Sequence, residues 1–209
     1  MLTAVQALAR LREGNRRFVA DQSTVTTVSN AARREALVVR QEPFAIILGC
    51  SDSRVPAELV FDQGFGDLFV IRVAGNIVAP SQVGSVEFAA SRFGTRLVVV
   101  MGHSQCGAVI ATLEELLGRR TTQSRNLRSI VDRVRPAVET LLANREVEDL
   151  DAIVREAARA NVRASVNHLR HGSQMLEELA KTAGLVVVGA EYSLDTGVVT
   201  FFGDAVDAG

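Results

Sequence analysis

Two cysteines and one histidine are the residues of this chain whose types and spacing point most directly to chemistry. Cys50, His103 and Cys106 include both cysteines and one of the three histidines, and Cys50 and His103 each come just after an apolar run that ends in glycine. A Cys2His set leaves the fourth tetrahedral position of zinc open to water, whereas a structural zinc site is usually closed by a fourth protein ligand. We therefore expect a catalytic site with one Zn²⁺ per chain, of the kind that hydrolytic or hydrating enzymes use.

A carboxylate and a guanidinium lie within four residues of the first cysteine, in the segment Cys50-Ser-Asp52-Ser-Arg54. Asp52 held by Arg54 would stay ionised, accept a hydrogen bond from a zinc-bound water and orient it. Asp52 could also rotate to become a fourth zinc ligand and close the site. By themselves these two residues could be a surface ion pair of little energetic value, but their place beside a predicted ligand favours a functional role.

The two cysteines could instead form one disulfide if the protein were secreted, because they are far apart in the sequence. Their combination with a histidine favours a metal site over a disulfide. A redox function of the two thiols is disfavoured because the chain has no CxxC pair.

Elements that can position these residues are visible in the apolar pattern. Short runs rich in β-branched residues predict buried strands at 44–49, 68–72, 97–102 and 185–189, with an edge strand at 198–202 after the turn 195–197. Helical stretches are expected at 81–93, 107–117, 127–143, 149–171 and 173–183. This alternation indicates an α/β fold with a mainly parallel β-sheet flanked by helices.

The predicted ligands would meet at one edge of that sheet. Ligands of open α/β sheets collect at the carboxyl ends of the strands, where Cys50 and His103 both lie. Cys106 lies near the start of the next helix, where the helix dipole favours the thiolate that binds zinc.

The N-terminal segment predicts a helical arm. Leu2, Val5, Leu8 and Leu11 recur at helical spacing before the polar stretch 21–30. Residues 1–40 should therefore pack as an arm on the main domain or on another subunit. We expect the whole chain, 1–209, to form a single domain.

Length, composition and charge narrow the class of protein. The chain has 209 residues, of which 47% are hydrophobic, and a formal net charge of -1. These values predict a globular protein with no general affinity for nucleic acid or for anionic membranes, and thus a small-molecule substrate. No apolar run approaches the roughly 20 residues that span a bilayer, and charged residues interrupt the N-terminal apolar positions, so we expect a cytoplasmic protein without a signal peptide.

Three motifs together resemble the β-class carbonic anhydrases. They are Cys50-Ser-Asp-Ser-Arg-Val-Pro-Ala-Glu58, Phe69-Val-Ile-Arg-Val-Ala-Gly-Asn76 and Gly102-His-Ser-Gln-Cys-Gly107. The resemblance implies the fold of that family and zinc ligation by Cys50, His103 and Cys106. It implies reversible hydration of CO2 to bicarbonate and a proton, with Asp52 and Arg54 orienting the zinc-bound hydroxide that attacks carbon. It also implies a homodimer or a dimer of dimers, whose shared interface lines the active site.

The resemblance assigns further residues to the substrate pocket, namely Gln41, Phe69, Phe88 and Gly107. Many relatives of the same subclass have a tyrosine where this chain has Phe88, so a hydroxyl group is missing from the expected pocket.

Two subclasses of the family differ beside the zinc. In one, a tryptophan, an arginine and a tyrosine bind bicarbonate and favour the form in which the aspartate closes onto zinc. Arg72 and Tyr192 stand at plausible positions for two of these residues, but Ile47 replaces the tryptophan, and the chain has no tryptophan at all. We therefore expect the open subclass, in which Asp52 stays off the metal at neutral pH.

Two other functions remain open at this point. The same site could hydrolyse carbonyl sulfide or carbon disulfide, because a hydroxide that attacks CO2 can attack any small linear heterocumulene. A non-catalytic zinc-binding or bicarbonate-binding protein is the other alternative, although Asp52 and Arg54 are both present.

Overall fold

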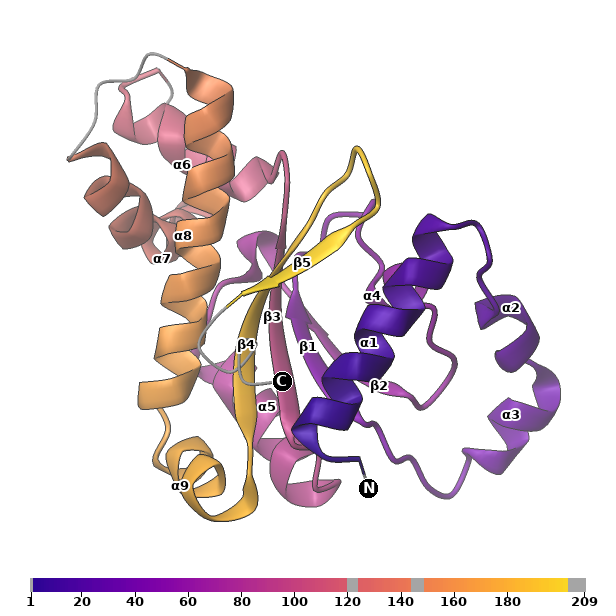
Figure 1. Cartoon of the computed structure of the whole chain (residues 1–209). Helices are drawn as coiled ribbons and strands as arrows, with labels where there is room; N and C mark the ends of the chain where they lie inside the picture. Colours follow the sequence, from indigo (N-terminus) through magenta and orange to yellow (C-terminus); the bar gives the residue numbers. More distant parts are fainter. Residues whose placement is uncertain (1, 120–123, 144–148, 203–209) are drawn as a thin grey trace.

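A five-stranded sheet organises the part of the chain that the structure describes. The computed structural model describes residues 2–119, 124–143 and 149–202. The strands are β1 (Ala45–Gly49), β2 (Leu68–Arg72), β3 (Leu97–His103), β4 (Val186–Tyr192) and β5 (Val199–Phe202), in the order β2-β1-β3-β4-β5. The strands β1 to β4 pair in parallel, and β5 is antiparallel to β4. The predicted α/β fold with a mainly parallel sheet is confirmed (Figure 1).

Helices occupy every stretch in which the sequence predicted a long one. They are α1 (Ala4–Val19), α5 (Pro80–Arg92), α6 (Gly107–Leu116), α7 (Arg125–Leu142), α8 (Leu150–His171) and α9 (Gln174–Ala183). Short helices that the sequence analysis did not predict are α2 (Val25–Val28), α3 (Ala31–Ala36) and α4 (Ala57–Val60), with a 3-10 turn at Ala74–Asn76. These segments are too short to show a helical period in the sequence.

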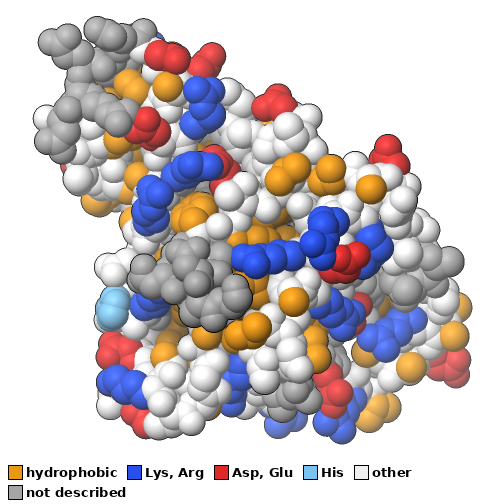
Figure 2. All heavy atoms as spheres, in the orientation of Figure 1, with side chains coloured by type: hydrophobic (Ala, Val, Ile, Leu, Met, Phe, Trp, Pro, Cys, Tyr) orange, Lys and Arg blue, Asp and Glu red, His pale blue; other side chains and the backbone are white. Residues whose placement is uncertain are grey.

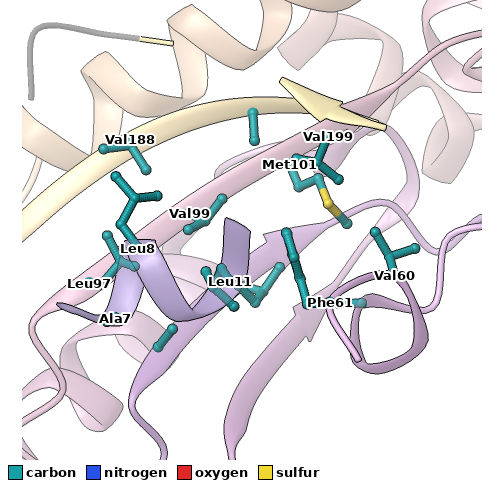
Figure 3. Close-up of a cluster of buried hydrophobic side chains, with 14 of the residues drawn as sticks. Ala7, Leu8, Leu11, Val60, Phe61, Leu97, Val99, Met101, Val188 and Val199 are labelled. Atoms are coloured by element: carbon teal, nitrogen blue, oxygen red, sulfur yellow. The ribbon is translucent and has the colours of Figure 1, made fainter. Parts of the chain in front are cut away.

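Helix α1 covers one face of the sheet. Its N-terminus is capped by Thr3 and Gln6, whose side chains each accept a hydrogen bond from the other residue's backbone N–H. Ala7 and Leu11 are fully buried against sheet side chains that include Leu97, Val99 and Val188 (Figure 3). Val5 is 69% exposed, so its predicted place on the apolar side of this helix was wrong. The buried positions are 4, 7, 8 and 11, a helical period that leaves position 5 facing away from the sheet.

Helices α5, α8 and α9 cover the opposite face. The buried side chains there come from alternate strand residues and from these helices, and the helical ones include Val86, Val162, Leu169 and Leu176. Figure 1 shows α1 and α8 on opposite sides of the sheet, which gives three layers. Within the described residues, no helix is long and apolar enough to cross a membrane.

A third cluster of buried residues lies at the carboxyl ends of the strands. Apolar side chains of α6, α7 and the first half of α8 pack there with Cys50 and Cys106. In Figure 1, α6 and α7 lie beside α8 beyond the end of the sheet. This packing places the start of α6 against the ends of β1 and β3, where the sequence analysis expected the site.

The segment that follows α1 is fastened to the domain by one buried carboxylate. Asp62 accepts hydrogen bonds from the side chain of Arg17 and from the backbone N–H groups of Thr24 and Val25. Burial raises the pKa of Asp62, but these hydrogen bonds outweigh it and leave the pKa below its usual value. Helices α2 and α3 extend to the side of the sheet in Figure 1. Figure 2 shows the molecule from the same direction, with acidic, basic and hydrophobic side chains interspersed over its surface.

Candidate metal centre

The structure brings Cys50, His103 and Cys106 together. Cys50 directly follows β1, His103 is the last residue of β3, and Cys106 is the residue that caps the N-terminus of α6. Because β1 and β3 are neighbouring parallel strands, their carboxyl ends lie side by side. The candidate ligand atoms all lie within 4.8 Å of one another, and the three residues are 6%, 0% and 1% exposed.

The imidazole of His103 is oriented for metal binding. Its Nδ1 lies 2.9 Å from the carbonyl oxygen of Ser104, and because a carbonyl can only accept, Nδ1 carries the proton. Nε2 therefore holds a free lone pair, and this buried atom has no hydrogen-bond partner among the described residues. Leaving such an atom unpaired costs about 1–3 kcal/mol. A metal ion between Nε2 and the two sulfurs would satisfy it, so the donor set fits zinc.

The sulfur of Cys50 is positioned by the 3-10 turn that follows β2. The backbone N–H of Gly75 donates to Sγ of Cys50 at 3.3 Å. Gly75 has a φ of 70°, and a Cβ there would lie 2.9 Å from the Cβ of Ala108. On its other side, the Gly75 carbonyl accepts from the Asn161 side chain at 2.7 Å. A glycine is thus required for the backbone to approach the sulfur in this conformation.

The two thiols behave as a pair that retains one proton. A hydrogen bond from the Cys106 thiol lowers the pKa of Cys50 to about 4, against the opposing effect of burial, with further help from the backbone N–H of Gly75. The same hydrogen bond, together with burial, raises the pKa of Cys106. The lowered pKa of Cys50 favours its thiolate, and a cation that displaces the proton of Cys106 would create the second thiolate.

Asp52 lies next to this cluster and is held by Arg54. The Nε and Nη2 atoms of Arg54 donate to the two carboxylate oxygens of Asp52 at 2.9 and 2.7 Å, and the Arg54 backbone N–H donates at 3.0 Å. These hydrogen bonds hold the pKa of Asp52 well below its usual value. Oδ2 of Asp52 is 3.9 Å from Nε2 of His103, so an ionised carboxylate stands beside the candidate ligands.

Arg72 contributes a contact that the sequence analysis did not foresee. Its Nε donates to the carbonyl oxygen of Cys50 at 2.9 Å, and its Nη2 donates to the carbonyl oxygen of Asp52. The family resemblance had included Arg72 in the second motif and placed it at a plausible position for an arginine that binds bicarbonate in the other subclass. The parallel register, in which Arg72 is paired with Gly49, is the signal that would have located it beside Cys50.

The residues predicted to line the substrate pocket do not all lie at this centre. Gly107 is the first residue of α6 and follows Cys106 directly. Phe69, in contrast, is paired with Ile46, four residues before Cys50, or about 13 Å along the strand. Its ring lies 6.2 Å from that of Phe88, which is 52% exposed.

Gln41 is also separate from the candidate ligands. It is exposed in the segment before β1, where it lines a surface pocket of about 1060 Å³. Phe93 lines the same pocket, and its ring lies 6.0 Å from that of Phe69. Gln41 is therefore near the aromatic side chains and not near the candidate metal ligands of its own chain. None of the three candidate ligands lines this pocket.

Comparisons with known proteins agree on one family. A family model described as carbonic anhydrase matches residues 45–199. The chain is 39% identical over 193 residues to carbonic anhydrase 2 of Mycobacterium tuberculosis, which covers 92% of this chain and 90% of that protein. It is 37% identical to a carbonic anhydrase of Mycolicibacterium smegmatis, with 93% and 91% covered.

Solved structures resemble the whole fold. A β-carbonic anhydrase of Aspergillus fumigatus has a TM-score of 0.75 at 28% identity, with 95% of this chain and 89% of that chain covered. One of two β-carbonic anhydrases of Sordaria macrospora, described as tetrameric, has a TM-score of 0.73 at 25% identity, with 83% and 87% covered.

Proposed function

Because this chain belongs to the β-carbonic anhydrase family, we propose that it catalyses the reversible hydration of CO2 to bicarbonate and a proton at a zinc ion held by Cys50, His103 and Cys106. The observation that carries this proposal is the buried, unpaired Nε2 of His103, grouped with two thiol sulfurs within 4.8 Å. Two sulfurs and one nitrogen are ligands that suit zinc, and three protein ligands leave one tetrahedral position for the reaction. Bound zinc would lower the pKa of a water molecule, which is the chemistry that hydration of CO2 requires.

Asp52 and Arg54 orient the attacking water in this proposal. The carboxylate is ionised and can therefore only accept a hydrogen bond, which fixes one O–H direction of a water beside the ligands. Arg54 binds both carboxylate oxygens and so keeps the side chain beside the ligands rather than among them. The arrangement supports the open subclass, in which Asp52 stays off the metal at neutral pH.

A second copy of the chain completes the site in this proposal. Phe88 is 52% exposed, and the segment that leads to Gln41 exposes Val38 and Val39 at 81% and 95%. Large exposed apolar side chains of this kind mark association surfaces. Self-association as a homodimer or a dimer of dimers would cover them and bring Gln41, Phe69 and Phe88 to the partner's metal centre. The cytoplasmic location stays a prediction.

Stopped-flow measurement of CO2 hydration with a pH indicator tests the proposed function. The zinc-loaded protein should turn over CO2 much faster than the chelator-treated protein, and readdition of zinc should restore the rate. A protein that binds one zinc per chain and shows no hydration above the buffer rate would defeat the proposal. Hydrolysis of carbonyl sulfide or carbon disulfide by that same protein would then identify the alternative substrate class.

A further inference from the structure

One guanidinium binds the backbone of a metal-ligand residue and of the aspartate beside it. Arg72 donates from Nε to the carbonyl oxygen of Cys50 and from Nη2 to the carbonyl oxygen of Asp52. The segment from Ser51 to Arg54 lies outside any helix or strand, and Ser51 and Arg54 are exposed. Its far end is fixed by Val55, which is 1% exposed. Between that anchor and the end of β1, the path of the backbone depends on few contacts.

Two arginines bind different parts of Asp52, one the carboxylate and the other the backbone carbonyl. Arg54 binds the carboxylate, but Asp52 and Arg54 belong to the same short segment and would move together. Arg72 belongs to β2, whose pairing with β1 fixes it relative to the end of the sheet. Arg54 also reaches the carbonyl oxygen of Gln105, at 3.5 Å, but among the described residues Arg72 is the one whose side chain links this segment to a strand of the sheet. The Asp52 carbonyl receives one other hydrogen bond, from the backbone N–H of Val55 within the same turn.

We propose that Arg72 is a positioning residue that holds the Cys50–Asp52 backbone so that the Asp52 carboxylate stays beside the metal and does not ligate it. This inference rests on the proposed function, because it assumes a metal at the three candidate ligands. Oδ2 of Asp52 is 3.9 Å from Nε2 of His103, so the carboxylate lies next to the candidate ligands and its distance from the metal depends on where the backbone is held. Arginine suits the role since its planar fork can bind two carbonyl oxygens at once.

Visible absorption of the cobalt-substituted protein tests this role, because cobalt reports its ligand set without turnover. In Arg72→Met, released Asp52 should replace water as the fourth ligand, so the ligand-field bands near neutral pH should differ from those of the wild type. With zinc, kcat should fall about 10- to 100-fold while KM changes little, as expected for lost orientation. Arg72→Lys should resemble Arg72→Met, because one ammonium cannot reproduce the fork although it keeps the charge.

Arg170→Met is the matched control. Arg170 also donates two hydrogen bonds to a backbone carbonyl, that of Val187 on β4, away from the candidate ligands. This variant should keep the wild-type cobalt spectrum and kcat. Circular dichroism melts establish that each variant is folded, and if Arg72→Met does not fold, Arg72→Lys carries the test.

Two results would overturn the inference. One is a cobalt spectrum and a kcat of the Arg72 variants that match the wild type. The other is full rescue by Arg72→Lys, which would show that charge rather than positioning matters. A wild type that binds cobalt but does not hydrate CO2 would defeat the proposed function alone, and the spectra would still decide the role of Arg72. A wild type that binds no metal would overturn both.

Discussion

The predicted active site has two regions, and a single chain brings the residues of one together but leaves those of the other exposed and apart from it. Cys50, His103 and Cys106 are at most 6% exposed, and backbone groups of Gly75 and Ser104 orient the first two of them. Gln41 is exposed, Phe88 is 52% exposed, and the pocket that Gln41 lines includes none of the candidate ligands. Folding thus organises the metal region (Cys50, His103 and Cys106), whereas we propose that association completes the substrate region (Gln41, Phe69 and Phe88). Preorganised ligands and an unfinished pocket are what a site shared between subunits requires.

Removing a ligand should have the largest effect and should separate the two regions most clearly. In Cys50→Ser the hydroxyl is a poor substitute for a thiolate, so we expect loss of stoichiometric zinc. The rate of CO2 hydration should fall by more than about 100-fold, since changes outside the ligand set already cost about 10- to 100-fold. Metal analysis and stopped-flow assays measure both. Retention of one tightly bound zinc and of turnover would place the metal elsewhere.

Asp52→Asn should lower turnover while leaving the metal region intact. The amide cannot act as an ionised acceptor toward water, so kcat should fall about 100-fold. Zinc content should stay at one per chain, because the three candidate ligands are unchanged. Asp132→Asn, at an exposed carboxylate of α7, serves as the control. Equal kcat values for Asp52→Asn and the wild type would remove Asp52 from the mechanism.

Gly75→Ala should damage the metal region through its backbone. Gly75 and Gly184 have nearly the same φ, 70° and 68°, but a Cβ meets Ala108 only at Gly75. Gly184→Ala should therefore cost about 1 kcal/mol of unfolding free energy from strain, and Gly75→Ala about 2–3 kcal/mol from strain plus overpacking. Urea unfolding measures the difference, and competition with a chelator should show weaker zinc binding only for Gly75→Ala. Identical stability losses in the two variants would contradict the crowding of Gly75 against Ala108.

Asp62→Asn should loosen the segment that leads to Gln41 while zinc binding stays unchanged. We expect a loss of about 1–2 kcal/mol near pH 7, where the carboxylate is ionised and hydrogen-bonded. The folded pKa of Asp62 lies below its unfolded value, so this stabilisation is present above about pH 4 and is lost as the pH falls through the folded pKa. Urea unfolding at pH 7 and pH 3 should thus show a smaller difference at pH 3. The exposed control Asp195→Asn should lose little stability at either pH. If the stability difference between Asp62→Asn and the wild type were the same at pH 7 and pH 3, an ionic contribution would be excluded.

The sequence best predicted the candidate metal ligands that lie at the ends of strands. Apolar runs located the strand ends to within three residues, the largest difference being the end of β4, and the parallel pattern predicted that Cys50 and His103 would meet. The supporting contacts could not be read in the same way. The Gly75 N–H reaches Cys50 only through a turn of positive φ, and the fork of Arg72 acts through the register between β1 and β2.

For the substrate region, the sequence predicted which residues take part but not how they are arranged. The resemblance transfers the identities of Gln41, Phe69 and Phe88, but it does not say which subunit's metal they serve. Short helices such as α2 and α3 were also missed, since fewer than two helical turns give no period. Their positions depend on tertiary contacts, which are the hydrogen bond from Thr24 to Asp62 near α2 and the contacts of Arg33 in α3 with Phe65 and Asp67.

A subunit-mixing experiment tests the division of the site most directly. One variant carries Cys50→Ser and lacks a working metal region, and the other carries Gln41→Ala with Phe88→Ala and lacks a working substrate region. If each site combines the metal region of one chain with the substrate region of its partner, equimolar co-refolding should restore about a quarter of the wild-type rate, because half of the dimers are mixed and each has one intact site. A mixture no faster than the average of the two separate variants would show that each chain completes its own site.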